Sequence, residues 1–281
     1  MENDIMMGIK YLSIIARELS MPLVLCLGLG TNHGGHNRGG ALGSLLERFG
    51  DFRGSVIVVS GGNEANMNHH YHSGTLEPKE EVEVEIRVGD SESGFTMELW
   101  TDAPELYSVG LISPSGEYSG RTQARLWEHR EIYFILEDTY VNIDYLLLSD
   151  ESGDECIRMR FNAPEEGIWR LRVFNETDIA GRFDIWLPIR NFISDENYFL
   201  QPDPNITLCE PSNNSFLITN AYYNSDNRSV AVDSGRGYTR RGLIKPDIAA
   251  PGVNVFGPLP RLGNVYPQDE QERLDTARYG Y

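Results

Sequence analysis

Five of the six histidines gather in two short segments and could supply metal-binding or proton-transfer chemistry. His33 and His36 lie in one segment, and His69, His70 and His72 lie in the other. Imidazole is a common zinc ligand and a general base near neutral pH. No histidine pair stands at i and i+4 on a helix with a glutamate beside it, and no nucleophile is positioned next to His33 or His36. We therefore predict no metal site and no cofactor.

The three cysteines do not form a cross-linking or metal-binding pattern. Cys26, Cys156 and Cys209 are odd in number and widely spaced. Cys26 lies inside an apolar run, which is typical of a small buried hydrophobic residue. We predict no disulfide framework.

Two glycine-rich segments follow apolar runs, and a third segment carries a long motif. The first is Gly28-Leu29-Gly30-Thr31 and the second is Ser60-Gly61-Gly62-Asn63-Glu64. Taken alone, Gly-Gly-Asn after a strand is most simply a turn, because Gly and Asn favour turn conformations. The third segment, residues 236–254, reads Arg-Gly-Tyr-Thr-Arg-Arg-Gly-Leu-Ile-Lys-Pro-Asp-Ile-Ala-Ala-Pro-Gly-Val-Asn. The order of the three segments along the chain carries more information than any one of them.

The elements that must position the first two segments alternate between helix and strand. Residues 23–27 and 56–59 are short, continuous apolar runs, typical of strands buried on both faces of a parallel sheet. Residues 41–49 predict a helix between them, which gives a right-handed crossover. Residues 4–19 predict a first amphipathic helix, whose expected apolar face consists of Ile5, Ile9, Leu12, Ala16 and Leu19.

From about residue 77 the hydrophobic pattern changes to a period of two. Val82, Val84, Ile86 and Val88 alternate with charged residues, as in a half-exposed strand. Turn sequences separate six more such segments: residues 96–100, 108–112, 131–136, 156–161, 169–174 and 183–187. All four tryptophans lie in this part. Several short strands at this spacing predict an antiparallel sandwich.

The predicted domain division follows from where the pattern changes. We expect an α/β core in two segments, residues 1–76 and 191–281, interrupted by the inserted β-sandwich at residues 77–190. Residues 216–222 and 229–232 are predicted strands of the second core segment. Both junctions are expected to be surface loops, where an inserted domain is tolerated.

Charge and hydropathy exclude some partners. The net charge is −18, and most of it lies within residues 77–190. This balance argues against nucleic acid or an anionic membrane surface as a partner, and favours a solvated acidic surface. No apolar run is long enough to span a bilayer, so we predict no membrane insertion. The sequence leaves the oligomeric state open.

In this order, the three segments resemble the subtilisin-like serine proteases, or subtilases. That family has a pocket-wall strand, a helix, a strand that ends in Gly-Asn, and an I-K-P-D-I-x-A-P-G-V run. The resemblance covers residues 1–74 and about 215–257. It implies an α/β fold, with an incomplete subtilisin-like parallel sheet flanked by helices and an inserted, jelly-roll-like antiparallel β-sandwich. Clostridial spore-germination proteases have this layout, which implies a bacterial, spore-associated or secreted protein.

The resemblance also implies roles for individual residues. Asn63 would be catalytic, because in this family the asparagine amide donates a hydrogen bond to the oxyanion. Gly28, Leu29 and Gly30 would pair with the substrate backbone and form one wall of the primary specificity pocket. Gly61 and Gly62 would form the opposite wall. Gly28 stands where the family usually has Ser.

The departures from the family concern the catalytic triad. The family carries its Asp in Asp-Thr/Ser-Gly, its His in His-Gly-Thr and its Ser in Gly-Thr-Ser-x-Ala. Neither of the last two motifs occurs in this sequence, and Asp233-Ser234-Gly235 falls after the Gly-Asn segment, out of the family's order. The chain is therefore interpreted as an internal piece of a larger protease, and we expect it to hydrolyse no peptide bond by itself.

Three functions remain open from the sequence. The first is a serine endopeptidase in the complete parent, which would act on a peptide or protein substrate by Ser/His/Asp acyl transfer. The second is a catalytically dead pseudoprotease that binds a partner, for example in spore germination. The third is a binding module in which the acidic sandwich recognises the partner.

Overall fold

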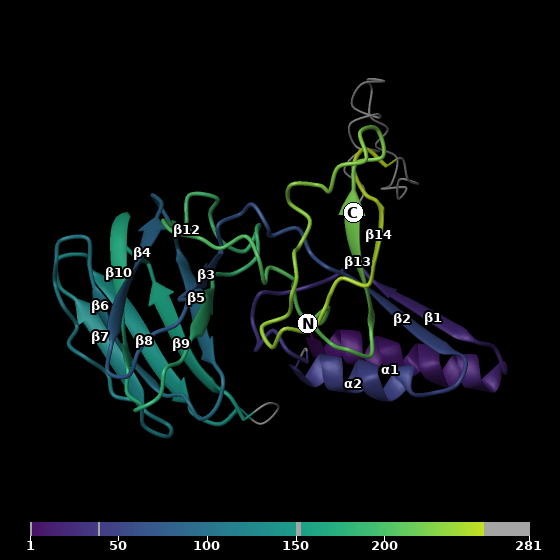
Figure 1. Cartoon of the computed structure of the whole chain (residues 1–281), viewed down its shortest axis with the longest axis horizontal. Coiled ribbons are helices and arrows are strands. Elements are labelled where there is room, and N and C mark those ends of the chain that lie inside the picture. Colours follow the sequence, from purple (N-terminus) through teal and green to yellow (C-terminus); the bar gives the residue numbers. More distant parts are fainter. Residues whose placement is uncertain (1, 39, 150–152, 256–281) are drawn as a thin grey trace.

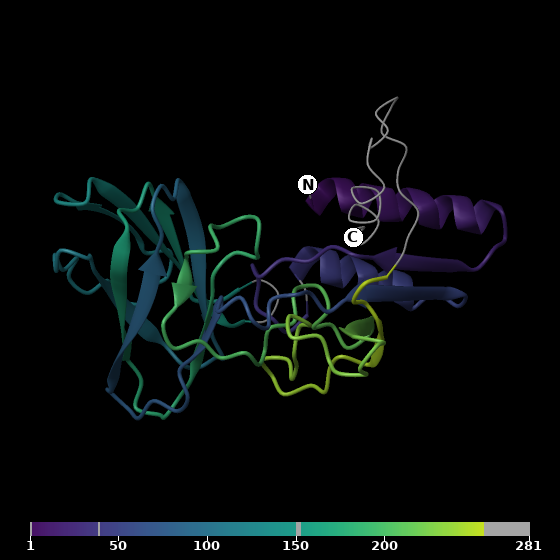
Figure 2. The same cartoon turned by 90° about the horizontal axis from the view of Figure 1, so that it is seen from above.

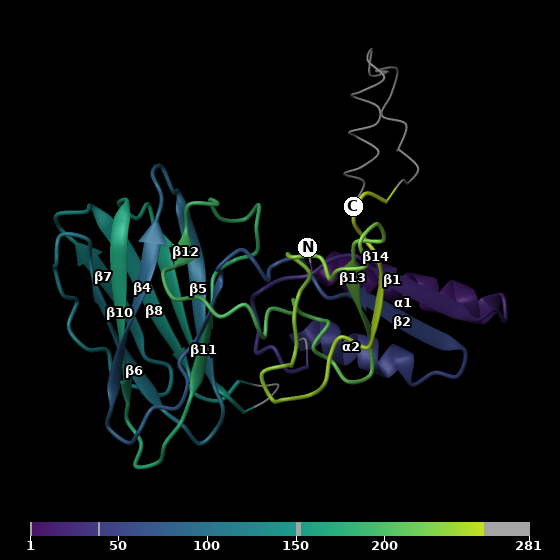
Figure 3. The same ribbon diagram turned by 45° about the horizontal axis from the view of Figure 1, so that its top comes forward.

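The computed structural model describes residues 2–38, 40–149 and 153–255. Residues 256–281, the end of the predicted second core segment, lie outside the described residues. The chain forms two parts that lie side by side: a layer of parallel strands with two helices, and a larger antiparallel sandwich (Figure 1, Figure 2, Figure 3). No helix in the described ranges is both long and apolar enough to cross a membrane.

The first part, called the parallel layer, contains both helices of the described chain. Its sheet has the order β1-β2-β13-β14, and every pair in it is parallel. The elements are α1 (Glu2–Glu18), β1 (Leu23–Leu27), α2 (Gly40–Gly50), β2 (Ser55–Ser60), β13 (Ile218–Tyr223) and β14 (Ile248–Pro251). The helices and strands predicted between residues 4 and 59 are confirmed to within two residues at each end.

The two helices cover only one face of the parallel layer. Ile9 of α1 and Leu46 of α2 pack in one apolar cluster with Leu25 and Ile57, which are partners in the β1–β2 register. On the other face, the side chain of Val24 is 67% exposed. The expectation that this strand is buried on both faces is therefore wrong.

The predicted apolar face of the first helix is also only partly right. Ile9 is buried, but Leu12 and Leu19 are exposed, and Ser13 takes a buried place on the inner face. Ser13 is accommodated there because its hydroxyl donates to the Ile9 carbonyl oxygen at 2.9 Å.

The predicted fold class is wrong for this chain. We expected an α/β protein with a parallel sheet flanked by helices. The described residues are predominantly β: they hold two helices, both on one face of a four-stranded sheet, beside a four-stranded and a six-stranded antiparallel sheet. The helix–strand alternation is confined to residues 2–60 and is too short to set the class of the whole chain.

The second part, called the sandwich, consists of the two antiparallel sheets. Their orders are β12-β4-β10-β6 and β3-β11-β5-β9-β8-β7. The strands are β3 (His70–His72), β4 (Glu81–Val88), β5 (Gly94–Thr101), β6 (Tyr107–Ile112), β7 (His129–Phe134), β8 (Thr139–Leu146), β9 (Glu155–Asn162), β10 (Gly167–Asn175), β11 (Phe183–Trp186) and β12 (Tyr198–Phe199). Strands β3 and β12 lie outside residues 77–190, and the division of the chain at those positions stays a prediction.

Several strand assignments differ from the prediction, and the short strands β3, β12 and β14 were not predicted. Residues 229–232 form no strand, because only Val230 makes an isolated bridge, to Tyr223. Strand β8 was not predicted, although Val141, Ile143 and Tyr145 alternate along it and are fully buried. The inner faces of the two sheets cover each other. The apolar residues that alternate along the strands therefore form one closed core, as in other sandwiches.

Candidate functional site

A cleft of about 1680 Å³ opens where the parallel strands end, between the parallel layer and the sandwich. Both glycine-rich segments line it, and both follow the carboxyl end of a parallel strand, β1 or β2. Ligands of open parallel sheets bind outside this edge. The sandwich adds a further group of lining residues: Glu98, Trp100, Trp127, Leu146, Leu148 and Arg158.

Residues 28–30 form one side of the cleft. The backbone groups of Leu29 and Gly30 make no hydrogen bond to any other described residue, and the Leu29 side chain is exposed. A Cβ atom at Gly28 would meet nothing within 4 Å. The backbone of this segment is therefore free to pair with the backbone of a peptide.

Residues 61–63 form the opposite side. The Gly61 amide donates to the Asn220 carbonyl oxygen of β13 at 2.9 Å, and the Gly62 carbonyl oxygen accepts the Gly235 amide at 2.9 Å. Gly62 has a φ of 87°, a conformation that favours glycine. The turn is thus fixed from both sides by segments far away in the sequence.

Asn63 lines the cleft next to this turn. Its side chain is half-buried, and its side-chain amide makes no hydrogen bond to another described residue. A half-buried amide without a partner is available to a ligand in the cleft. The structure therefore brings together all six predicted site residues, Gly28, Leu29, Gly30, Gly61, Gly62 and Asn63, around one cleft, while their roles stay predictions.

Cys209 lies between the two sides of the cleft, and no sequence pattern indicated it. Its amide donates to the Gly61 carbonyl oxygen at 3.1 Å. The next residue, Glu210, exchanges backbone hydrogen bonds of 3.0 and 2.8 Å with Thr31. The segment around Cys209 is therefore pinned to both sides, and only 3% of Cys209 is exposed.

The sandwich holds the loop that follows the first side of the cleft. Glu98 of β5 accepts the Gly34 amide at 2.9 Å and the Arg158 Nε at 2.8 Å, and it lies 3.4 Å from His33 Nδ1. Burial alone would raise the pKa of Glu98, but the hydrogen bond and charge of His33 and the charge of Arg158 bring it down to about 2. Glu98 is therefore an ionised anchor. Its role requires contacts between β5 and a distant loop, which the sequence does not reveal.

The predicted histidine cluster is split between structural roles. His69 Nδ1 lies 2.7 Å from a Glu64 carboxylate oxygen, while His70 and His72 both contact Asp184, at 3.0 and 2.8 Å. His36 stacks on Trp186 of the sandwich at 3.8 Å between ring centroids, and burial lowers its pKa to about 4. Within the described ranges, no group of three or more His, Cys, Asp or Glu residues is placed to hold a metal ion.

The long motif at residues 236–254 builds the scaffold behind the cleft. The Lys245 ammonium contacts the Asp247 carboxylate at 2.5 Å and the Leu217 carbonyl oxygen at 2.5 Å. Asp247 also accepts the Thr219 amide at 2.7 Å. These bonds hold β14 in register beside β13, so this part of the motif serves the sheet.

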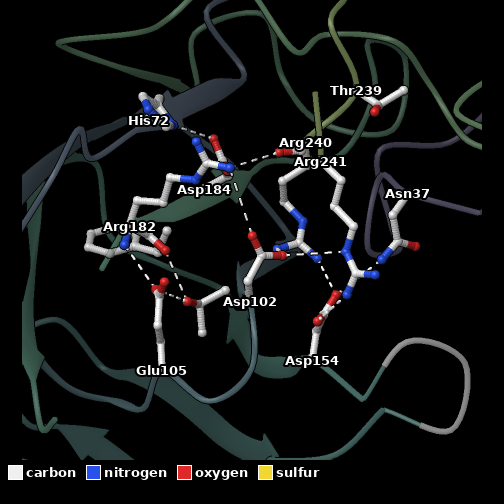
Figure 4. A network of polar contacts seen from close by, with 12 residues as sticks. Asn37, His72, Asp102, Glu105, Asp154, Arg182, Asp184, Thr239, Arg240 and Arg241 are labelled. Carbon is white, nitrogen blue, oxygen red and sulfur yellow. Dashed lines mark hydrogen bonds and ion pairs between the residues drawn. The ribbon is translucent and has the colours of Figure 1, made fainter. Parts of the chain in front are cut away.

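The arginines of the same motif fasten the parallel layer to the sandwich (Figure 4). Arg240 is buried and pairs with Asp154, which is also buried, and with Asp102 at 2.8 Å. Arg241 is half exposed and reaches Asp154 at 2.7 Å. Arg240 also donates to the Gly35 carbonyl oxygen at 2.8 Å. This arginine clamp, defined as Arg240, Arg241, Asp102 and Asp154, fixes the loop beside the cleft.

The chain shares its fold with a protease. That relative is the CspB protease of Clostridium perfringens, whose structure matches with a TM-score of 0.83 at 29% sequence identity. The match covers 94% of this chain and 55% of that chain, so the chain spans about half the length of the relative. No protein-family model and no curated protein matches the sequence.

Proposed function

We propose that the chain is the substrate-binding part of a subtilisin-like serine endopeptidase of the clostridial spore-germination type, interrupted by a jelly-roll-like sandwich. The observation that carries the proposal is that two glycine-rich segments and the unbonded side-chain amide of Asn63 lie around one cleft. The 29% identity to a protease over 94% of the chain supports it.

Each lining segment has a task in this function. The substrate backbone pairs with residues 28–30, and a substrate side chain enters between Gly30 and Gly62. The Asn63 amide donates to the oxygen that becomes negative when the peptide carbonyl is attacked. Such a donor lowers the barrier, because its bond is stronger in the transition state than in the ground state. The Ser, His and Asp that perform acyl transfer come from outside this sequence.

The first experiment measures peptide binding by the 281-residue chain itself. We expect labelled peptides to bind, and we expect their backbone contacts to shift the amide NMR signals of residues 28–30 and 61–63. Gly28→Ser is a matched control that should bind as the parent chain does, because a side chain there meets nothing within 4 Å. If peptides shift no signals in these two segments, the cleft is not a peptide site.

The second experiment concerns Asn63 in a polypeptide that surrounds this chain with a complete triad. Asn63→Ala should lower kcat about a hundredfold or more with little change in KM, a size taken from subtilisin itself. Asn63→Asp, which keeps the shape but removes the N–H donor, should lose turnover similarly. Unchanged turnover in both variants would show that Asn63 is only a turn residue.

The second candidate function is a pseudoprotease that binds peptides or proteins without cleaving them. It is favoured by the lack of His-Gly-Thr and Gly-Thr-Ser-x-Ala in this sequence. The flanking parts of the gene distinguish the two functions. A downstream segment without Ser in the Gly-Thr-Ser-x-Ala position would establish the pseudoprotease.

A further inference from the structure

The Cys209 side chain lies against Gly30 and Gly62, on the two sides of the cleft, and closes the floor of the space between them, which is called the slot. A Cβ atom built on Gly62 would lie 2.3 Å from Cys209 Sγ, and one built on Gly30 would lie 2.7 Å from Cys209 Cβ. Both distances are far below a normal contact. The thiol therefore occupies the space that the absence of side chains at the two glycines opens.

Cys209 cannot easily leave this position. Its backbone amide is bonded to Gly61, and its neighbour Glu210 is bonded twice to Thr31. The thiol also contacts the Asn32 side-chain oxygen at 3.5 Å, which fixes its direction. The floor of the slot is thus attached to both sides and is as rigid as they are.

The chemistry of this floor is neutral. Burial raises the pKa of the Cys209 thiol, so it stays protonated. Two carboxylates, Glu64 and Glu210, act on the thiol. Glu64 is engaged with His69 and with the Arg190 amide at 3.0 Å. Glu210 accepts the Asn37 amide at 3.1 Å. The slot accordingly has no free charge that could pair with a basic or acidic side chain. The thiol also takes up the space that a large side chain would need.

We propose that Cys209 sets the substrate specificity of the cleft and restricts the residue that enters the slot to glycine or alanine. This inference rests on the proposed function and names the substrate class of the same site. A larger side chain would have to displace the thiol from a packed position, and overpacking of this kind is unfavourable. A polypeptide with a small residue at the contact position is the expected partner.

The test uses four labelled cyclic peptides that differ only at the central residue, which is Gly, Ala, Leu or Phe. A cyclic peptide loses less conformational entropy on binding than a linear one, so weak binding becomes measurable. In fluorescence anisotropy titrations, the parent chain should bind the Gly and Ala peptides about tenfold or more tightly than the Leu and Phe peptides.

Cys209→Gly should abolish this preference. It should bind the Leu and Phe peptides about tenfold more tightly than the parent chain does, and the Ala peptide within about threefold. Cys26→Ala removes an exposed thiol from β1 and is the matched control, with no change in preference. If the variant at position 209 does not fold, the parent chain with the four peptides decides the matter alone.

Two results would overturn the inference, and they are distinguishable. Equal binding of the Ala, Leu and Phe peptides by the parent chain would show that Cys209 does not limit the slot, while the peptide site itself stands. Binding of none of the peptides, by the parent chain or by Cys209→Gly, would overturn the proposed function and the inference with it.

Discussion

The sandwich and the parallel layer close their cores to different extents. In the sandwich, the two sheets cover each other, and Phe134, Trp169 and Phe183 are completely buried. In the parallel layer, helices cover one face only, and Val24 and Val56 of the other face are exposed. A pair of facing sheets completes its own core, whereas a single sheet with one covered face does not.

The less complete part carries the cleft, and the more complete part supports it. Glu98 of the sandwich holds the Gly34 amide, Trp186 stacks on His36, and Arg240 joins the two parts. The loop behind the first side of the cleft thus takes its position from a rigid neighbour. The sandwich therefore lines the cleft and also holds one side of it in place.

The largest expected effect tests the core of the sandwich. Trp169 packs edge-on against Phe134 and Phe161, at 5.0 and 5.5 Å between ring centroids. Trp169→Ala should lower the free energy of unfolding by about 3–5 kcal/mol in urea denaturation, because it leaves a cavity. Trp127→Ala, at a side chain that is 73% exposed, is the matched control and should change it by less than about 0.5 kcal/mol. Similar losses in both variants would contradict the comparison.

The next effect tests the contact between the two parts. Arg240→Met should cost about 3 kcal/mol, because the buried Asp154 carboxylate loses one of its two arginine partners. Calorimetry should then resolve two transitions, one for each part. Arg241→Met, at a half-exposed arginine of the same clamp, should cost less and keep a single transition. A single transition in Arg240→Met would show that other contacts couple the parts.

A buried carboxyl group of the sandwich, Glu155, should make the free energy of unfolding depend on pH. Burial, together with repulsion from Glu105 and Glu176, raises the pKa of Glu155 from 4.5 to about 8. Between these two pH values the folded state binds more protons than the unfolded state, so the free energy of unfolding falls as the pH rises. Glu155→Gln should flatten this dependence and stabilise the chain by about 2 kcal/mol at pH 8.

The control for this titration is Glu166→Gln, at an exposed turn of the sandwich. Unfolding curves of both variants between pH 4 and pH 9 are compared with those of the parent chain. The exposed variant should follow the parent curve. An unchanged slope in Glu155→Gln would mean that another group binds the proton.

Sequence reasoning found the local features and missed those that depend on distant contacts. The apolar runs at residues 23–27 and 56–59 correctly predict strands, and the glycines that follow each run line the cleft. Both features can be recognised from neighbouring residues alone. Cys209 and Glu98 were missed, because their roles follow from neighbours far away in the chain. The predicted fold class was wrong for a related reason. An apolar run predicts a buried strand, but it does not reveal whether helices cover one face of the sheet or both.

The smallest expected effect tests the open face of the parallel layer directly. Val24 and Leu25 are neighbours on β1 that point to opposite faces, one 67% and one 6% exposed. Val24→Thr keeps a β-branched side chain and should change the free energy of unfolding by less than about 0.5 kcal/mol. Leu25→Ala on the helix-covered face should cost about 2–5 kcal/mol. A cost above about 1 kcal/mol for Val24→Thr would show that this face is covered in solution. If that cost also grew with protein concentration, the cover would be a second copy of the chain, since only an association equilibrium makes stability depend on concentration.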